Sequence, residues 1–244
     1  MLSFFKQFSN KVDFSVLETD MHSHLVPGID DGAKTVDKSV AYIKELKNLG
    51  FKKIITTPHI MGEHYPNTPE IIQRGLAKLK NALTEVEIEI EISAAAEYFV
   101  DDYFVDLLNQ EKPLLTLPDN HLLIEFSTFA PPSNFQEVLF RLNTLGYKPI
   151  LAHPERYVYY AEKFNFFHET KAKGCALQVN LLSLIGHYGG LQKKLAHRLM
   201  KEKLIDFAGT DLHNGGHIEV LKKLIQNRQM QSYLRNYPFL NNKF

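Results

Sequence analysis

The sequence predicts an α/β fold in which short strands and longer helices alternate around a parallel sheet. From about residue 17 onward, short apolar runs alternate with amphipathic stretches of helical length, the pattern typical of repeated β-α units. The segments between the apolar runs are long enough to be the crossovers that parallel strands require. A chain of 244 residues is also a common length for one β/α barrel domain.

Seven strands are expected, one on each short apolar run. They are placed at 16–21, 53–57, 87–95, 121–126, 148–152, 175–179 and 205–209. The third run begins with strict alternation and then becomes small and apolar, which indicates an exposed start leading into a buried end. A single domain is expected over 1–244, with 1–15 as an extension before the first strand.

Helices are expected between these strands, on the stretches with helical periodicity. They are placed at 35–49, 69–83, 134–145 and 191–202. Gly50 and Gly146 directly follow two of them, and glycine after a periodic stretch is a common helix stop.

Composition and charge exclude several classes of protein. Lys plus Arg and Asp plus Glu both number 28, so no excess of positive charge indicates nucleic-acid or lipid binding. The N-terminal residues are too polar for a signal peptide, and no stretch approaches the roughly 20 apolar residues of a membrane span. A cytoplasmic protein without membrane insertion is expected. Cys175 is the one cysteine, which excludes disulfide frameworks and thiolate zinc sites.

Metal-binding side chains follow almost every expected strand at its carboxyl end. They are His22, His24, His59, Glu97, Glu125, His153, Asp211 and His213. In β/α barrels the carboxyl ends of the strands meet at one rim, where functional groups collect. One histidine alone is more often structural, but the repetition at one position of each unit predicts a shared metal centre.

Spacing strengthens the prediction at two of these strands. His22 and His24, like Asp211 and His213, are two residues apart, so on a strand both members of a pair point to the same face. Imidazole and carboxylate ligands without sulfur suit Mn²⁺, Zn²⁺, Fe²⁺ or Mg²⁺. The ligands outnumber what one ion can use, so more than one ion is expected.

The other histidines are assigned by position. His121 opens its strand, so it is expected at the opposite end of the sheet in a structural role, and His168 and His197 fall in expected helices. The rim-loop residues His64, His187 and His217 remain open as substrate contacts. Aromatic residues near the rim are either packing or a shallow pocket for a phenyl ring; they are Tyr65, Tyr98, Phe99, Phe129 and Tyr188.

Six motifs in order carry a resemblance to a known family. They are DMHSHLVPGIDDGAKT, TTPH, AAAEY, LLIEF, LAHPERY and GTDLH, and together they sample residues 20–213. With them the chain resembles the PHP (polymerase and histidinol phosphatase) superfamily, in particular its bacterial tyrosine-protein phosphatases of capsule and exopolysaccharide systems.

The resemblance implies a distorted, seven-stranded, TIM-like β/α barrel of PHP type with two or three divalent ions, usually Mn²⁺. By position it implies that His22, His24, Glu97 and Asp211 bind one ion, and that Glu97, Glu125 and His153 bind a second. Asp31, His59 and His213 would serve a third. Asp31 lies in an Asp-Asp-Gly tripeptide that is also an ordinary turn signal, and it is preferred to Asp30 because it adjoins Gly32.

The implied activity is hydrolysis of phosphotyrosine, by resemblance on the tail of a membrane-bound tyrosine autokinase that controls polysaccharide export. Arg156 follows His153 by three residues, and in a site full of acids its expected use is bidentate binding of phosphate rather than pairing with a helix carboxylate. His59 and Asp31 are both left as candidates for protonating the leaving group. The oligomeric state is left undetermined.

The chain departs from the resemblance at one place. Relatives often carry a further arginine after the closing motif, whereas His213 is here followed by Asn-Gly-Gly and His217. Either His217 or a lysine such as Lys222 substitutes for it, or Arg156 and the metals bind the phosphate alone.

Three alternatives stay open. They are a phosphoesterase of small molecules such as histidinol phosphate, a nuclease domain and a non-enzymatic metal-binding module. A cysteine-phosphatase mechanism is excluded, because it needs an arginine six positions after the nucleophile and position 181 is Leu.

Overall fold

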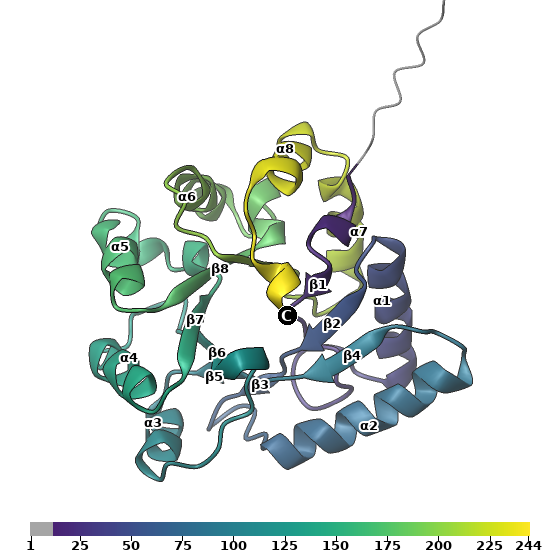
Figure 1. Cartoon of the computed structure of the whole chain (residues 1–244), viewed down its shortest axis with the longest axis horizontal. Helices are drawn as coiled ribbons and strands as arrows, with labels where there is room; N and C mark the ends of the chain where they lie inside the picture. The colour runs from purple at the N-terminus through teal and green to yellow at the C-terminus, as the bar shows by residue number, and fades with distance from the viewer. Residues whose placement is uncertain (1–11) are drawn as a thin grey trace, which may run out of the picture.

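Short parallel strands surrounded by helices make up the computed structural model, which describes residues 12–244 (Figure 1). Within these residues nine strands form two sheets, with the orders β1-β2-β4 and β3-β5-β6-β7-β8-β9. All neighbouring strands are parallel. The strands are β1 Thr19–Asp20, β2 Lys53–Thr56, β3 His59–Ile60, β4 Glu91–Ala94, β5 Glu97–Phe99, β6 His121–Glu125, β7 Lys148–Ala152, β8 Ala176–Asn180 and β9 Phe207–Gly209. The predicted α/β fold with a parallel sheet is confirmed.

The strand count differs from the expected seven because the expected strands 53–57 and 87–95 are each followed by an additional short strand. β2 ends before Pro58 and β3 follows it, since proline has no N–H for a sheet hydrogen bond. β4 and β5 are likewise separated by two alanines. Backbone hydrogen bonds continue across both interruptions, from Ala95 N–H to the Thr56 carbonyl at 3.0 Å and from Glu97 N–H to the Pro58 carbonyl at 3.2 Å.

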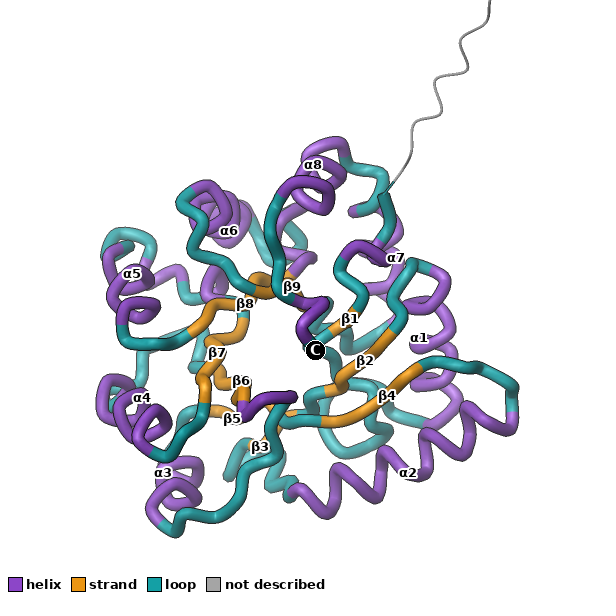
Figure 2. The backbone as a smooth tube through the Cα atoms, in the orientation of Figure 1, coloured by secondary structure: helices purple, strands orange, loops and turns teal. Residues whose placement is uncertain are grey.

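The beginning and end of the strand series are also linked. The Asp211 N–H donates to the His22 carbonyl at 2.8 Å, and the His24 N–H donates to the Leu212 carbonyl at 2.9 Å. Ser23 and Leu212 form an isolated parallel bridge. The segment after β1 therefore lies beside the segment after β9, and Figure 2 shows the strands arranged around a common centre with the helices outside.

Eight α-helices surround the strands within the described part of the chain. They are α1 Val36–Asn48, α2 Pro69–Glu85, α3 Asp102–Asn109, α4 Phe135–Thr144, α5 Asn165–Ala172, α6 Gly190–Lys201, α7 Gly215–Leu224 and α8 Arg228–Asn236. The four expected helices lie within two residues of α1, α2, α4 and α6. In α2, Pro69 occupies the first turn, where its missing N–H costs nothing, and the Thr68 side chain caps the helix. No helix from residue 12 onward is both long and apolar enough to span a membrane.

Side chains that alternate in direction along the strands form an outer core and an inner core. In β6, Leu122 and Ile124 pack in the large cluster beneath the helices, whereas Leu123 packs in a smaller inner cluster with Ile150 and Phe207. Glu125, two residues beyond Leu123, continues the inward row. The inner core therefore fills one end of the space between the strands and leaves the other end to polar side chains.

The last residues close the end that carries the inner core. Phe244 stacks on Phe207 with ring centroids 4.9 Å apart and meets His121 edge-on at 5.1 Å. The chain end therefore lies near the centre of the strands (Figure 1). His121 opens β6 and lies at this end, as expected.

The expected N-terminal extension is only partly described. Residues 1–11 lie outside the described residues. Residues 12–15 do not form a detached extension, because Phe14 is fully buried and stacks on Phe51 with centroids 4.9 Å apart.

Candidate metal centre

The two histidines after β1 are both fully buried and point their Nε2 atoms to the same place. Their Nε2 atoms are 3.3 Å apart. The other ring nitrogen of each is anchored, His22 Nδ1 at 2.7 Å from Gln178 Oε1 and His24 Nδ1 at 2.9 Å from Asp30 Oδ2. These oxygens accept the Nδ1 protons, so the Nε2 lone pairs are free to bind a metal.

Glu97, at the start of β5, lies at the centre of the cluster and is fully buried. Its Oε2 is 3.2 Å from His22 Nε2, 3.3 Å from His24 Nε2 and 3.2 Å from His59 Nδ1, yet it accepts no well-directed hydrogen bond. Its Oε1 lies 3.1 Å from His153 Nε2. Three imidazole nitrogens around a buried carboxylate oxygen that has no hydrogen-bond partner are the arrangement expected of ligands to common cations.

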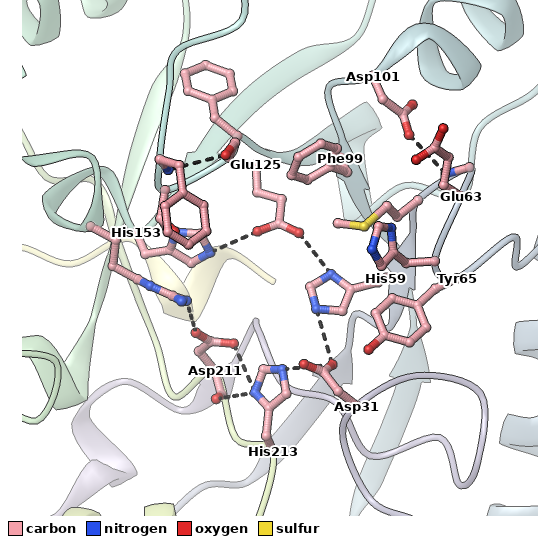
Figure 3. A pocket seen from close by; sticks show the side chains of 18 of the residues that line it. Asp31, His59, Glu63, Tyr65, Phe99, Asp101, Glu125, His153, Asp211 and His213 are labelled. Carbon is pink, nitrogen blue, oxygen red and sulfur yellow. Dashed lines mark hydrogen bonds and ion pairs between the residues drawn. The ribbon is translucent and has the colours of Figure 1, made fainter. Parts of the chain in front are cut away.

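Glu125, at the end of β6, connects two further imidazoles on the pocket side (Figure 3). Its Oε1 is 2.9 Å from His59 Nδ1 and its Oε2 is 3.6 Å from His153 Nε2. The outer edge is formed by Asp31, whose Oδ1 is 3.4 Å from His59 Nε2 and 3.3 Å from His213 Nε2. The Asp31 side chain is half exposed, so this edge is open to the pocket.

Asp211 uses its two oxygens differently. Oδ1 lies 3.4 Å from the Nε2 atoms of both His22 and His24 and 3.3 Å from His213 Nδ1. Oδ2 accepts hydrogen bonds from Arg156 Nη1 at 3.2 Å and from Asn180 Nδ2 at 2.8 Å. Arg156 therefore lies directly beside the cluster, with its side chain partly exposed.

The local backbone shows why the sequence folds tightly here. His153 and Asp211 have positive φ angles of 35° and 49°, a conformation that non-glycine residues adopt mainly where surrounding structure enforces it. A Cβ on Gly32 would lie 2.4 Å from His24 Cβ, and a Cβ on Gly209 would lie 2.7 Å from His22 Cβ. Glycine at these two positions leaves room for the two histidines.

Burial and opposite charges shift the pKa values of the cluster in opposing directions. Burial lowers the pKa of His59, but Glu125 and Asp31 together outweigh burial, and the pKa rises to about 10. Burial raises the pKa of Asp211, but His22 and His213 bring it well below its ordinary range. The site thus holds ionised carboxylates only if positive charge lies among them, which protons or divalent cations can provide.

All nine sequence-predicted ligands lie in this cluster, in four overlapping groups that can hold metal ions. The groups are His24, Asp31, His59 and His213; His22, His24 and Asp211; His22, Glu97 and His153; and His59, Glu97 and Glu125. These groups differ from the implied assignment at three histidines. His24 lies with Asp211 and also with Asp31, His153 lies with His22 and Glu97, and His59 lies with Glu97 and Glu125 as well as with Asp31. The donor set of imidazoles and carboxylates fits divalent metal ions.

A cavity of about 860 Å³ opens from the cluster. Four of the five rim aromatics line it, namely Tyr65, Phe99, Phe129 and Tyr188. Tyr98 does not, because its ring is buried in the core and its hydroxyl accepts the Leu115 N–H at 2.8 Å. Phe129 is 94% exposed at the cavity edge, where an aromatic ligand can cover it.

Two of the three histidines considered as substrate contacts line the cavity, and the third does not. His64 and His217 line the cavity, whereas His187 packs against His217 with centroids 5.1 Å apart. Lys222 does not reach the site, because its ammonium pairs with Glu45 at 2.8 Å and with Glu219 at 3.0 Å. Lys222 is therefore excluded as the replacement for the missing arginine. The remaining alternatives are His217, which lines the cavity, and phosphate binding by Arg156 and metals alone.

Three polar residues that contact the cluster were not expected. Asp30 holds His24, Gln178 holds His22, and Asn180 holds Asp211. A sequence signal for the last two existed, since Gln178 and Asn180 are two apart at the end of an otherwise apolar strand. Amides are not typical ligands for the metals considered, so a search for ligands overlooks them.

The parallel β-α fold with a His and carboxylate cluster at the carboxyl ends of its strands defines an α/β protein with a candidate metal centre at the strand ends. A solved histidinol phosphate phosphatase from Lactococcus lactis shares the fold at 16% identity and a TM-score of 0.50, covering 86% of this chain and 92% of that one.

The chain belongs to the family described as capsular polysaccharide synthesis, CpsB/CapC, whose model matches residues 18–237. The expected membership among capsule and exopolysaccharide proteins is confirmed. Two relatives are the tyrosine-protein phosphatase YwqE of Bacillus subtilis, 30% identical over 80% of this chain and 77% of the relative, and the tyrosine-protein phosphatase CpsB of Streptococcus pneumoniae, 28% identical over 80% and 82%.

A solved structure from work on the metal-dependent tyrosine phosphatases YwqE and CpsB matches as well. It has a TM-score of 0.75 at 27% identity and covers 91% of this chain and 96% of that one. The likeness therefore extends over most of the fold.

Proposed function

We propose that this protein is a metal-dependent protein-tyrosine phosphatase. The observation that carries the proposal is the convergence of nine imidazole and carboxylate side chains beside one arginine. Its relatives YwqE and CpsB carry the name tyrosine-protein phosphatase. Two or three divalent ions are proposed among the four ligand groups, with Mn²⁺ as the proposed metal.

The roles of the ligand side chains follow from their positions. We propose that His22, His24, Glu97 and Asp211 hold one ion, Glu97, Glu125 and His153 a second, and Asp31, His59 and His213 a third. The proximity of His153 Nε2 to Glu97 Oε1 and Glu125 Oε2 supports the second set, and the grouping of His24 with Asp31, His59 and His213 adds His24 to the third. Bound divalent ions supply Lewis-acid stabilisation of phosphoryl oxygens and a nucleophile at neutral pH. Gln178 and Asp30 keep the two inner imidazoles oriented.

The remaining steps belong to side chains at the cavity. Arg156 donates two parallel hydrogen bonds to the non-bridging phosphate oxygens and opposes their charge as the bond to the leaving oxygen breaks. Tyrosinate, with a pKa of about 10, leaves without strong assistance. His59 and Asp31 line the cavity and are the candidates for delivering a proton to it.

The proposed substrate is a phosphotyrosine in a protein tail. The exposed ring of Phe129 and the ring of Phe99 at the cavity edge offer apolar surface to a phenyl group. The finer proposal is that the tail belongs to a membrane-bound tyrosine autokinase of capsule synthesis, and that the enzyme acts on it from the cytoplasm.

The finer architecture is proposed on the same basis. Counting β2 with β3 and β4 with β5 as single interrupted strands gives seven, and the links between the segments after β1 and β9 support a closed, distorted barrel. We take 1–244 as one domain.

One assay separates this proposal from its alternatives. The protein with Mn²⁺ is offered a phosphotyrosine peptide, histidinol phosphate and single-stranded DNA. Phosphate release from the peptide, abolished by chelator and by His22→Ala but unaffected by His168→Ala on the exposed surface, supports the proposal. Preference for histidinol phosphate or release of nucleotides overturns it, and absence of all three activities favours a metal-binding module.

A further inference from the structure

β8 ends at Asn180, whose side chain belongs to none of the ligand groups, yet Asn180 is fully buried at the edge of the cluster. Its Oδ1 accepts the Leu182 N–H at 2.8 Å and caps the 3-10 helix Leu181–Ile185. Its own backbone N–H donates to Glu155 Oε1 at 3.0 Å. Because the cap requires the amide oxygen, the orientation of the side-chain amide is fixed and its NH₂ group must face the site.

The two N–H groups of that amide have two acceptors. Asn180 Nδ2 lies 2.8 Å from Asp211 Oδ2 and 3.2 Å from the Tyr188 hydroxyl oxygen. The bond to Oδ2 sets the rotation of the Asp211 carboxylate, so that Oδ1 faces His22, His24 and His213. The bond to the hydroxyl holds the Tyr188 ring.

Asp211 and Tyr188 are also the two groups that hold Arg156. Asp211 Oδ2 accepts a hydrogen bond from Arg156 Nη1 at 3.2 Å, and the Arg156 guanidinium carbon lies 4.8 Å from the centroid of the Tyr188 ring. A guanidinium over an aromatic face is attracted by the ring quadrupole. An ion pair on one side and a ring on the other restrict the arginine to one approach to the cavity.

We infer that Asn180 is a positioning residue for phosphate capture, which fixes the Asp211 carboxylate and the Tyr188 ring between which Arg156 is held. Tyr188 is the second positioning residue, and its ring supports the guanidinium instead of receiving a substrate phenyl group. The inference rests on one part of the proposed function, namely that Arg156 binds phosphate.

The main test variant is Asn180→Asp, which keeps the shape and the oxygen that caps Leu182 N–H. It replaces both N–H donors with an oxygen, and it places a second carboxylate 2.8 Å from Asp211, where like charges repel. The matched control is Asn241→Asp. Asn241 is also fully buried and also uses both ends of its amide in hydrogen bonds, in its case to backbone groups, but it lies at the opposite end of the strands.

The readout is binding of inorganic orthophosphate to the Mn²⁺-loaded protein, measured by titration calorimetry, together with KM and kcat on a phosphotyrosine peptide. Asn180→Asp is expected to raise the Kd of orthophosphate and the KM about tenfold or more, the effect of disturbing a charged hydrogen-bond pair. Asn241→Asp is expected to lower the melting temperature and leave the Kd within about twofold.

Substitutions of Tyr188 provide a second, independent test, which remains available if Asn180→Asp does not fold. Tyr188→Leu removes the ring and is expected to raise the orthophosphate Kd roughly threefold to tenfold, whereas Tyr188→Phe keeps the ring and should change it less than about threefold. If Tyr188→Leu and Tyr188→Phe change the orthophosphate Kd equally, the ring does not support the Arg156 guanidinium.

A double-mutant cycle tests the route through Arg156. In an Arg156→Ala background, Asn180→Asp should weaken orthophosphate binding much less than in the wild type. Three results would overturn the inference. The first is that Asn180→Asp raises the orthophosphate Kd as much in the Arg156→Ala background as in the wild type. The others are an unchanged Kd in folded Asn180→Asp and an equal rise of the Kd in Asn241→Asp. A wild-type protein that binds orthophosphate but hydrolyses no phosphotyrosine refutes the proposed function and leaves this comparison intact.

Discussion

At the scale of single residues, three imidazoles of the cluster use one ring nitrogen for orientation and present the other to carboxylate oxygens of the cluster. His22 and His24 are held by Gln178 and Asp30, and His213 Nδ1 lies 2.9 Å from the Asp211 carbonyl. Glu97 has no comparable anchor for Oε2, although three imidazole nitrogens surround it. Glu97 is therefore the side chain on which the arrangement of cations depends most.

Glu97→Gln tests that dependence. Glutamine keeps the size but loses the charge and one ligand oxygen, so the variant should lose most of its bound metal, with kcat lower by a factor on the order of 10³. Metal content by mass spectrometry and steady-state kinetics measure both effects. The control is Glu137→Gln on the exposed face of α4, and full metal content in Glu97→Gln would contradict the assignment.

Cys175 tests the exclusion of thiol chemistry. Burial raises the pKa of its thiol to about 12, so the sulfur stays protonated and unreactive well above neutral pH. The folded protein is expected to resist iodoacetamide at pH 8 and to react once unfolded, as mass spectrometry can follow. Cys175→Ala should keep the wild-type kcat, and loss of activity on alkylation of the folded protein would speak against a metal-only mechanism.

At the scale of elements, the ends of the strands set the spacing of the cluster, and Gly209 at the end of β9 is a sensitive position. A Cβ there would lie 2.7 Å from His22 Cβ and 2.8 Å from Gln178 Nε2. Gly209→Ala should therefore displace His22 and weaken metal binding about 10–100-fold, with a loss of unfolding free energy of about 1–3 kcal/mol.

A matched substitution on α6 controls for the loss of glycine. Gly190→Ala meets no heavy atom within 4 Å, so it should leave metal binding and stability nearly unchanged. Metal titration and urea unfolding compare the two variants. Equal metal affinity in Gly209→Ala and the wild type would show that the end of β9 does not set the position of His22.

The elements also show what the sequence could and could not predict. The 148–152 run was placed correctly because its apolar residues are continuous and bounded by polar ones. The short strand β3 was not predicted, because His59 and Ile60 directly follow the expected strand 53–57 and Pro58. His59 was therefore interpreted as a rim residue after that strand. The rim acids and imidazoles were placed by their position after each strand. Asn180 was missed because its role depends on side chains distant in sequence, which periodicity cannot reveal.

At the scale of the whole molecule, one buried side chain joins the first and last strands at the end opposite the cluster. Asn241 Nδ2 donates to the carbonyls of Thr19 at 2.9 Å and Ala208 at 2.6 Å, and its Oδ1 accepts the Ala208 N–H at 3.0 Å. Asn241→Ala leaves these backbone groups unpaired, so the free energy of unfolding should fall by about 2–4 kcal/mol.

The same variant should keep the catalytic constants of the folded enzyme, since Asn241 lies at the opposite end of the strands from the cavity. Urea unfolding and kinetics below the transition temperature measure the two effects separately. A stability equal to that of the wild type would show that the chain end contributes little to joining β1 and β9.

The proposed function requires that separate side chains from the strand ends bind common divalent cations. Crystals grown with Mn²⁺ and measured at the manganese absorption edge test this binding. Anomalous peaks are expected about 2.0–2.4 Å from the Nε2 atoms of His22 and His24 and from oxygens of Glu97 and Asp211. An anomalous map with no peak among these side chains, from crystals that bind Mn²⁺ elsewhere, would contradict it.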